Sequence, residues 1–258
     1  MRIAYVTYEY PPDISQGGIA TYVQQVAKVM TERGHDVEIF CASATRTISE
    51  VFEGILVHRS KSLNPSDYQA ACVSIFTERH LKCPFDVIEC PEIHANALII
   101  KEKHPKITLA VKLHMPLFLQ MRLYNYYTPL FTKLRFFFGG LKKGQINIYG
   151  QYNYKKDPDY IITKIADGIC SPSLSLKNIL SKEWKIRFQE IDVIPYPFQP
   201  SEKSLAIPIE NNRENKVTFV GKLNVHKGLV NIIKIIKLIV KDHPDIVFTL
   251  IGNDSFLD

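Results

Sequence analysis

Short apolar runs alternate with amphipathic stretches along most of the chain, and this alternation narrows the possible folds more than any other feature. In the first unit, an apolar run at 3–6 precedes the loop YPPDISQGG. Apolar residues then recur at helical spacing from Ile19 to Met30, Gly34 marks a helix end, and DVEIFCAS follows. This succession predicts a β-α-β unit, and its continuous apolar runs are typical of a buried parallel sheet.

The same succession continues through the next 160 or so residues. Further strands are predicted at 54–60, 86–90, 107–114, 168–173 and 191–197, and helices at 65–80, 92–104 and 175–184. Strands and helices that alternate in this way predict an α/β fold of the Rossmann-like, doubly wound kind, with a parallel sheet.

A polar, proline-containing stretch predicts a domain boundary after this alternation. We expect an N-terminal Rossmann-like domain over 1–199 and a linker over 200–215. A new strand, helix and strand are predicted at 216–221, 228–242 and 246–252. Two strands and one helix are too few to bury their own apolar faces. We therefore expect 216–258 to be the beginning of a second Rossmann-like domain, truncated in this chain.

Positive charge is concentrated in one interval of the chain. The net charge is +6, but 103–156 contains ten Lys and Arg residues and no acidic residue, which suggests an anionic partner. Within it, 116–144 interleaves basic with aromatic residues. Such a segment can lie in a membrane interface, or it can be a helix packed on the domain with solvated charges. Nucleic acid is not expected as a partner, because no recognised nucleic-acid motif accompanies the segment.

Other bulk features point to a cytoplasmic protein with peripheral membrane contact through 116–144. The N-terminus reads as a buried strand and not as a signal peptide, and no apolar stretch reaches the length of a membrane span. The five cysteines are scattered and never form a C-x-x-C pair, so the sequence predicts neither a disulfide framework nor a metal site.

Several residues could carry chemistry at the ends of predicted strands. Gly17 and Gly18 precede a helix, where backbone N–H groups can approach an anion, although a plain tight turn would look the same. His114 ends a strand, on the side where open α/β sheets bind ligands, or it could simply bond a loop backbone. Lys222 and Lys227 flank a strand-to-helix turn and could hold a diphosphate, or could be solvated surface lysines.

Carboxylates provide candidates for binding a hydroxylated ligand. Glu89 and Glu92 belong to the stretch ECPE, and Glu9 follows the first strand. Paired carboxylates can act as acid and base or can bind sugar hydroxyls. We group Arg122, from the acid-free interval, with these three as candidate acceptor-binding residues.

Five stretches taken in order resemble glycosyltransferase family 4: YPPDISQGGIATYV, KLHMP, ADGICSPSLSLKN, VIPYPF and FVGKLNVHKGLVNII. The resemblance covers nearly the whole chain. It implies the GT-B fold, two Rossmann-like domains facing across a cleft, and a retaining sugar transfer that needs no metal. It implies that His114 lies near the transferred sugar, and that Gly17, Gly18, Lys222 and Lys227 bind the donor diphosphate.

The chain departs from the family pattern at three points. Lys222 stands where arginine is usual, which keeps the charge but loses the bidentate fork. VIPYPF replaces the usual Pro-Asn-Gly turn. A C-terminal glutamate pair that contacts the donor is expected beyond residue 258, so we expect this chain alone to have little activity.

The resulting hypothesis is a glycosyltransferase that uses a nucleotide-sugar as substrate, without a cofactor, and a glycan or lipid-linked acceptor. The product would be a glycan, polysaccharide or glycolipid. Two alternatives remain at this stage: a nucleotide-sugar epimerase of GT-B architecture, and a non-catalytic module that binds a membrane or partner through the basic segment.

Overall fold

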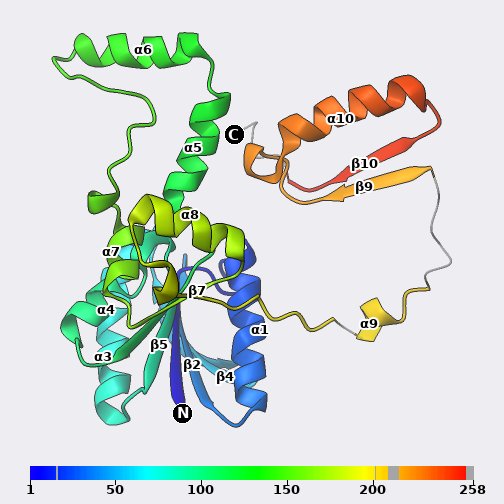
Figure 1. Ribbon diagram of the computed structural model, residues 1–258. Helices are drawn as coiled ribbons and strands as arrows, with labels where there is room; N and C mark the ends of the chain where they lie inside the picture. The colour runs from blue at the N-terminus through cyan, green and yellow to red at the C-terminus, as the bar shows by residue number, and fades with distance from the viewer. Residues whose placement is uncertain (16, 201, 209–214, 254–258) are drawn as a thin grey trace. The chain divides into compact units, whose positions relative to one another are not determined.

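The computed structural model describes residues 1–15, 17–200, 202–208 and 215–253, and it divides into two compact units (Figure 1). The first unit comprises Met1–Leu117 and Tyr152–Gln199. The second comprises Phe118–Gln151 and the described residues from Pro200 onward. Each unit is described by itself. The domain limits 1–199, 200–215 and 216–258 stay predictions.

An eight-stranded sheet forms the centre of the first unit, in the order β3-β4-β2-β1-β5-β6-β7-β8. All neighbouring strands are parallel except β3 and β4. The strands are β1 Arg2–Thr7, β2 Asp36–Ser43, β3 Ile48–Phe52, β4 Ile55–Lys61, β5 Val87–Pro91, β6 Thr108–Lys112, β7 Gly168–Ser171 and β8 Ile191–Val193. The predicted parallel α/β sheet is thus confirmed.

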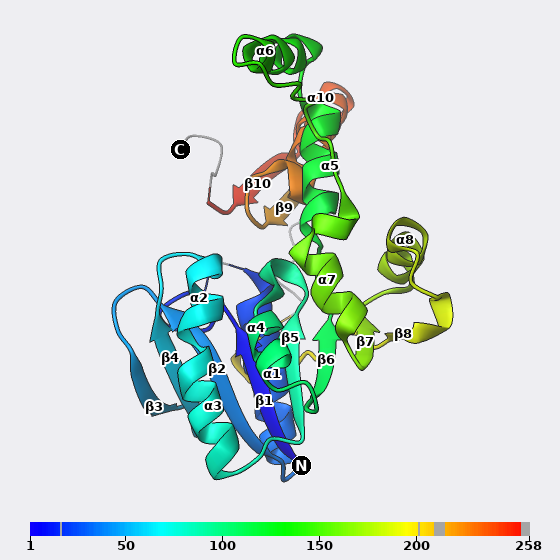
Figure 2. The same ribbon diagram turned by 90° about the vertical axis from the view of Figure 1, so that its left-hand side faces the viewer.

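Helices cover both faces of this sheet. Helix α1 lies on one face, and α2, α3 and α4 lie on the other (Figures 1 and 2). The helices of the unit are α1 Gly18–Glu32, α2 Pro65–Ala71, α3 Val73–Lys82, α4 Leu98–Lys103, α7 Pro158–Ile165 and α8 Leu174–Trp184, with 3-10 turns η1 Ile93–Ala95, η2 Tyr154–Lys156 and η3 Phe188–Glu190. This two-sided covering explains why β1 is buried at all of its residues.

Two helix predictions need correction. The helix expected over 65–80 is divided at Cys72 into α2 and α3. The helix expected over 92–104 is interrupted at its start, because His94 has a left-handed backbone with φ of 62°.

The antiparallel strand β3 was not predicted. It pairs with β4 through a turn in which Glu53 and Gly54 both have positive φ, and its side chains are mostly exposed.

A buried polar cluster accompanies the apolar core near the beginning of β2. The Glu38 carboxylate is 2% exposed and accepts hydrogen bonds from Arg2 and from Arg79 Nη2 at 2.6 Å. His58 Nε2 lies 2.8 Å from Glu38 Oε2. Since a buried charge is costly unless it is paired, these partners keep Glu38 ionised inside the fold.

The second unit contains two segments that are far apart in the sequence. The first is the helix pair α5 Leu117–Tyr127 and α6 Leu130–Leu141, followed by the return segment 142–151. The second has the predicted strand-helix-strand order, and β9 pairs in parallel with β10. Its elements are α9 Glu202–Leu205, β9 Lys216–Val220, η5 Val225–Lys227, α10 Leu229–Asp242 and β10 Val247–Ile251.

Part of the predicted linker lies outside the described residues, namely 201 and 209–214. Its described part includes the short helix α9. Among the helices that the structure describes, none combines the length and the apolarity needed to cross a bilayer.

Both ends of the excursion from the first unit into 118–151 are fixed by one short stretch at the start of α7. Where the chain leaves, the backbone N–H of Leu117 donates to Asp159 Oδ2 at 2.9 Å. Where it returns, the Tyr152 hydroxyl donates to Asp157 Oδ2 at 2.6 Å, and it accepts from the Trp184 indole N–H at 2.9 Å. Two carboxylates two residues apart therefore hold the entry and the exit of this excursion.

Candidate active site

The carboxyl ends of β1 and β5 meet at the point where the strand order reverses, which is where open α/β sheets bind ligands. A small cavity of about 40 Å³ lies there. It is lined by Thr7, Tyr8, Glu9, Ile19, Pro91, Ile93, His94 and Asn96. Asn96 is 2% exposed, and its Oδ1 has no hydrogen-bond partner among the described residues. The cavity therefore combines apolar side chains with a few polar groups, one of which has no partner within the described part of the chain.

The glycine pair precedes α1, as predicted. Gly17 is the N-cap residue and Gly18 is the first residue of the helix. A Cβ placed on Gly17 would lie 3.1 Å from Glu9 Oε2, so the glycine allows the Glu9 carboxylate to pack directly against the turn. The helix N-terminus and the Glu9 carboxylate are thereby brought to the same edge of the sheet. Diphosphate binding by this turn stays a prediction.

The loop between β1 and α1 is held from the side by Arg59. Its buried guanidinium donates to the carbonyl oxygen of Pro11 at 2.8 Å and to Glu50 Oε1 at 2.5 Å. It also lies over the Tyr10 ring, 5.9 Å from the centroid. Glu50 belongs to β3. The β3–β4 hairpin, which the sequence did not predict, therefore supports the loop that carries Glu9.

His114 follows β6 by two residues and has a fixed orientation. Its backbone N–H donates to both oxygens of the buried Glu92 carboxylate, at 2.9 and 2.8 Å. Its Nδ1 lies 2.9 Å from the Lys112 carbonyl oxygen, which can only accept, so Nδ1 carries the proton. Nε2 is left without a partner among the described residues. In the neutral ring this atom is a hydrogen-bond acceptor, available to a ligand.

Aromatic rings hold the His114 imidazole from two sides. The Tyr22 ring meets it edge-on and the Tyr196 ring stacks on it, each with a centroid separation of 5.1 Å. The Tyr196 hydroxyl donates to the Leu113 carbonyl oxygen at 3.0 Å. Tyr196 belongs to the VIPYPF stretch, so the residues that replace the usual turn contact the histidine.

Next to these rings lie a half-buried acid, Glu89, and a buried base, Lys112. The Tyr22 hydroxyl donates to Glu89 Oε1 at 2.6 Å, and burial raises the pKa of Glu89. Lys112 donates from Nζ to the Ile194 carbonyl oxygen, and burial lowers the pKa of this amine. Its Nζ is 5.6 Å from the centroid of the Tyr22 ring. Both ionisable groups thus lie in an environment that disfavours charge.

Asp159 links the segment that follows β5 to the segment that follows β6. Besides Leu117, it accepts a hydrogen bond from the backbone N–H of His94 at 2.9 Å. Burial, with the nearby charges of Asp157 and Glu92, raises the pKa of Asp159 to about 7. A carboxyl group with this pKa titrates near neutral pH, and here it is the group that accepts hydrogen bonds from both His94 and Leu117.

The sequence did not single out Tyr22, Lys112, Asp159 or Tyr196. One signal was present for Lys112, because it is the only charged residue of the otherwise apolar strand β6. Of the other three, Tyr22 lay on a predicted apolar helix face and Tyr196 in a predicted strand, and Asp159 lay in a stretch for which no element was predicted. Their roles depend on contacts between residues distant in sequence.

The remaining predicted residues belong to the second unit. Lys222 and Lys227 are both exposed and lie between β9 and α10, as predicted. The Asn224 side chain accepts from the backbone N–H of Lys227 at 3.1 Å, and Gly228, with φ of 79°, leads into α10. Arg122, on α5, lies over the Phe118 ring at 5.5 Å.

Comparison with known proteins identifies the family. The model of the family described as Glycosyltransferase Family 4 matches residues 16–202, which is most of the chain. The chain belongs to glycosyltransferase family 4. A curated relative of this family 4 chain, an uncharacterized glycosyltransferase of Methanocaldococcus jannaschii, is 28% identical over 96 residues. That alignment covers 35% of this chain and 24% of the relative.

Solved structures share the GT-B fold of this family 4 chain. The catalytic domain of starch synthase IV from Arabidopsis thaliana, bound to ADP and acarbose, has a TM-score of 0.58 at 12% identity. The similarity covers 98% of this chain and 68% of that one. Sucrose-phosphate synthase from Thermosynechococcus elongatus gives 0.56 at 13% identity, over 98% and 71%. An α-glucosyltransferase in complex with UDP and DNA gives 0.52 at 15%, over 94% and 55%.

Proposed function

We propose that this family 4 protein transfers a sugar from a nucleotide-sugar donor to an acceptor hydroxyl, with retention of anomeric configuration. The observation that carries the proposal is the His114 imidazole, held by Glu92, Tyr22 and Tyr196 with Nε2 unpartnered among the described residues. It lies beyond the carboxyl end of β6, on the ligand-binding edge of the sheet. An acceptor nitrogen in a fixed position suits a sugar hydroxyl.

The donor diphosphate is assigned to cations and backbone amides. Negative charge develops on the departing nucleoside diphosphate, and fixed positive groups stabilise that charge in the transition state. Lys222 and Lys227 provide two exposed ammonium groups next to the start of α10, and Gly17–Gly18 opens α1. ADP and UDP are bound by two of the similar solved structures, which supports a nucleoside diphosphate as ligand class. The proposal includes no cofactor.

The acceptor is assigned to the carboxylates and to Arg122. Glu9 lines the small cavity between β1 and β5, which fits a hydroxyl or hydroxymethyl group. Glu89 and Glu92 stay predicted acceptor ligands, and their carboxylates already accept hydrogen bonds from Tyr22 and His114. We propose a glycan or lipid-linked acceptor for polysaccharide or glycolipid synthesis, with the protein at the cytoplasmic face of a membrane that it contacts through 116–144.

Calorimetry with nucleoside diphosphates tests the donor site. We expect Lys222→Ala and Lys227→Ala each to weaken UDP or ADP binding about tenfold, because each removes a charge-assisted contact. Lys234→Ala, which removes an exposed lysine of α10, is the matched control and should leave the affinity unchanged. Equal affinities in all four proteins would refute the lysine assignment.

Product analysis tests the reaction itself. We expect transfer by this chain alone to be slow. NMR of the product should show the donor's anomeric configuration, and His114→Ala should abolish transfer while nucleoside diphosphate binding persists. Conversion of the donor without any acceptor would instead select an epimerase. Liposome binding without any donor turnover would favour the non-catalytic module.

A further inference from the structure

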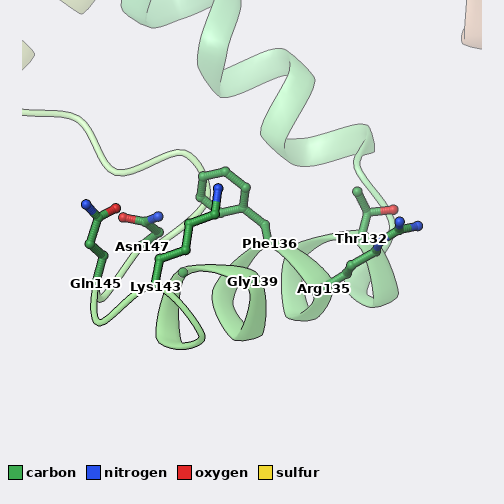
Figure 3. A pocket seen from close by; sticks show the side chains of 8 residues that line it. Thr132, Arg135, Phe136, Gly139, Lys143, Gln145 and Asn147 are labelled. Carbon is green, nitrogen blue, oxygen red and sulfur yellow. The ribbon is translucent and has the colours of Figure 1, made fainter.

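The pocket between α6 and the return segment does not gather its polar groups at one point. It has a volume of about 500 Å³, and Figure 3 shows Arg135 beside Thr132 at one end and Lys143 at the other. A ligand there would meet one cation at a time. Polar groups converge instead in the first unit, around the side-chain amine of Lys112, which the sugar-transfer proposal does not use.

Lys112 is a buried lysine whose amine bonds a neutral group. It is the last residue of β6 and is 3% exposed, and its Nζ donates to the Ile194 carbonyl oxygen. Burial lowers the pKa of this amine. A buried amine costs stability, since an apolar side chain of the same length would need no desolvation. Costs of this kind are typical of residues that serve a functional site.

The amine fixes the segment that carries Tyr196. Ile194 lies two residues before this tyrosine, and its backbone N–H donates to the Ser171 carbonyl oxygen at 2.9 Å. The segment is thus bonded to β6 through Lys112 and to β7 through Ser171. Tyr196 itself is 40% exposed, so packing alone does not hold the ring. Hydrogen bonds at Ile194 and at the Tyr196 hydroxyl therefore contribute to its position.

The same amine lies near both rings that contact His114. Its Nζ is 5.6 Å from the centroid of the Tyr22 ring and 5.3 Å from that of Tyr196. The two rings also contact each other, with centroids 5.1 Å apart. A cation is attracted to aromatic rings at such distances. Lys112 thus bonds the imidazole through its carbonyl oxygen and supports both rings through its amine.

We propose that Lys112 is a positioning residue of the sugar-transfer site: its amine holds Tyr22 and Tyr196 against His114, and the two rings keep the imidazole in the orientation that leaves Nε2 open to a sugar hydroxyl. Lys112 does not touch the substrate and acts through the two tyrosines. The inference rests on the proposed function, since His114 is the group that is positioned.

Replacement by methionine separates positioning from folding. Lys112→Met keeps an unbranched side chain but loses the N–H donors. The denaturation midpoint, followed by Trp184 fluorescence, should equal or exceed that of the wild type, because no buried amine has to be desolvated. A lower midpoint, or a failure to fold, would overturn the proposal, since the lysine would then be structural.

The matched control is Lys101→Met, at the other end of β6. Lys101 Nζ also donates to a backbone carbonyl oxygen, that of Ile107 at 2.7 Å, and it pairs with Asp167 at 2.8 Å. This variant should have a lower denaturation midpoint than the wild type, because it loses both contacts. It should leave the His114 site unchanged.

Proton NMR of the imidazole reports its position without any sugar transfer. The stacked Tyr196 ring should place the His114 ring-proton signals upfield of those of an exposed histidine. Absence of these signals from His114→Gln identifies them. In Lys112→Met, as in Tyr196→Leu, they should move toward the position of an exposed histidine, whereas Lys101→Met should leave them in place. Unchanged signals in Lys112→Met would overturn the proposal.

A double-mutant cycle tests the path through Tyr196. Lys112→Met and Tyr196→Leu should each lower kcat at least about tenfold, with the donor KM within about twofold, because misplacement affects the chemical step and not donor binding. The double variant should be at most about threefold slower than the slower single variant, since both changes remove the same support. Independent effects would multiply to about a hundredfold and would overturn the proposal.

The two measurements distinguish this inference from the proposed function. Absence of transfer by the wild type would contradict the proposed function, and the NMR signals of His114 would then decide by themselves whether Lys112 positions the imidazole.

Discussion

The β1-α1-β2 segment of the first unit and the β9-α10-β10 segment of the second unit have the same order of elements and similar apolar content. The strands of the first segment are buried, whereas the strands and the helix of the second are partly or fully exposed. Every residue of β1 and all but the first of β2 are buried. In contrast, β9, α10 and β10 contain no buried residue, and Leu238 on α10 is 68% exposed. The sequence pattern therefore determines the local elements, whereas burial depends on what packs against them.

The largest expected difference between the two units concerns single apolar side chains. Phe40, on β2, is fully buried and contacts the rings of Phe76 and Phe85. Phe40→Ala should lower the free energy of unfolding of the first unit by about 3–5 kcal/mol, because it leaves a cavity. Denaturant titration can follow this unit through Trp184, the single tryptophan, which is 1% exposed.

The matched variant in the second unit is Leu238→Ala, which should change stability by no more than about 0.5 kcal/mol, since the side chain is already in solvent. Circular dichroism can follow it. A loss of several kcal/mol at Leu238 would break the comparison, because it would show that α10 is covered in solution.

The second effect concerns the buried carboxylate of the first unit. Glu38→Gln should cost about 3 kcal/mol at pH 7, because Arg2, His58 and Arg79 lose their shared anionic partner. In the wild type these partners lower the pKa of Glu38 below its ordinary value of 4.5. The stabilisation is therefore complete above pH 4.5 and declines as the pH falls below it.

Unfolding titrations of wild type and Glu38→Gln at pH 7 and at pH 3.5 check this sign. The difference between the two proteins should shrink at the lower pH. A difference that does not depend on pH would mean that the Glu38 charge is not the stabilising feature.

The third effect has the opposite pH dependence. Burial raises the pKa of Asp159 from 3.8 to about 7, so the folded state binds more protons than the unfolded state between these values. Ionisation of Asp159 then costs stability as the pH rises from about 4 to 7. Asp159→Asn loses one of two acceptor oxygens but also removes this cost. Its stability relative to the wild type should improve by about 2 kcal/mol from pH 4 to pH 6.

Trp184 fluorescence can follow this titration as well, since Asp157 and Tyr152 link α7 to the indole. An offset between Asp159→Asn and the wild type that stays constant across the range would contradict a raised pKa.

The smallest effect compares two adjacent glycines of α6. Gly139→Ala should stabilise the helix by up to about 1 kcal/mol, because a Cβ there meets no atom within 4 Å. Gly140→Ala should destabilise the packing of the return segment on α6 by about 1 kcal/mol, because its Cβ would displace that segment. Hydrogen exchange of the Gln145 amide, which donates to Gly140, should accelerate only in the second variant. Equal rates would mean that the return segment does not pack on α6.

Much of the fold could be predicted from the sequence, because apolar periodicity and turn residues act locally. The parallel strands, α1, α8 and the β9-α10-β10 order all followed from such patterns. The short strand β3 did not, since its exposed, charged residues lack a buried face. The left-handed backbone at His94 also had no local signal, because it is stabilised from a distance by Asp159.

For the candidate site, the sequence offered only local signals. His114 stood out because it ends a predicted strand, and Gly17–Gly18 because they open a predicted helix. The functional roles of these residues stay predictions. The contacts of Tyr22 with Glu89, and of Lys112 with Ile194, join residues 67 and 82 positions apart. Such pairs depend on strand order and crossover geometry, which periodicity does not contain.

The carboxylates of Asp157 and Asp159 accept hydrogen bonds from Tyr152 and Leu117, the two residues that flank the helix pair α5–α6 and its return segment. We therefore expect the helix pair to be replaceable: a short bridge between residues 117 and 152 should close the scaffold in its place, and another helix pair should be accepted between the same two anchor points.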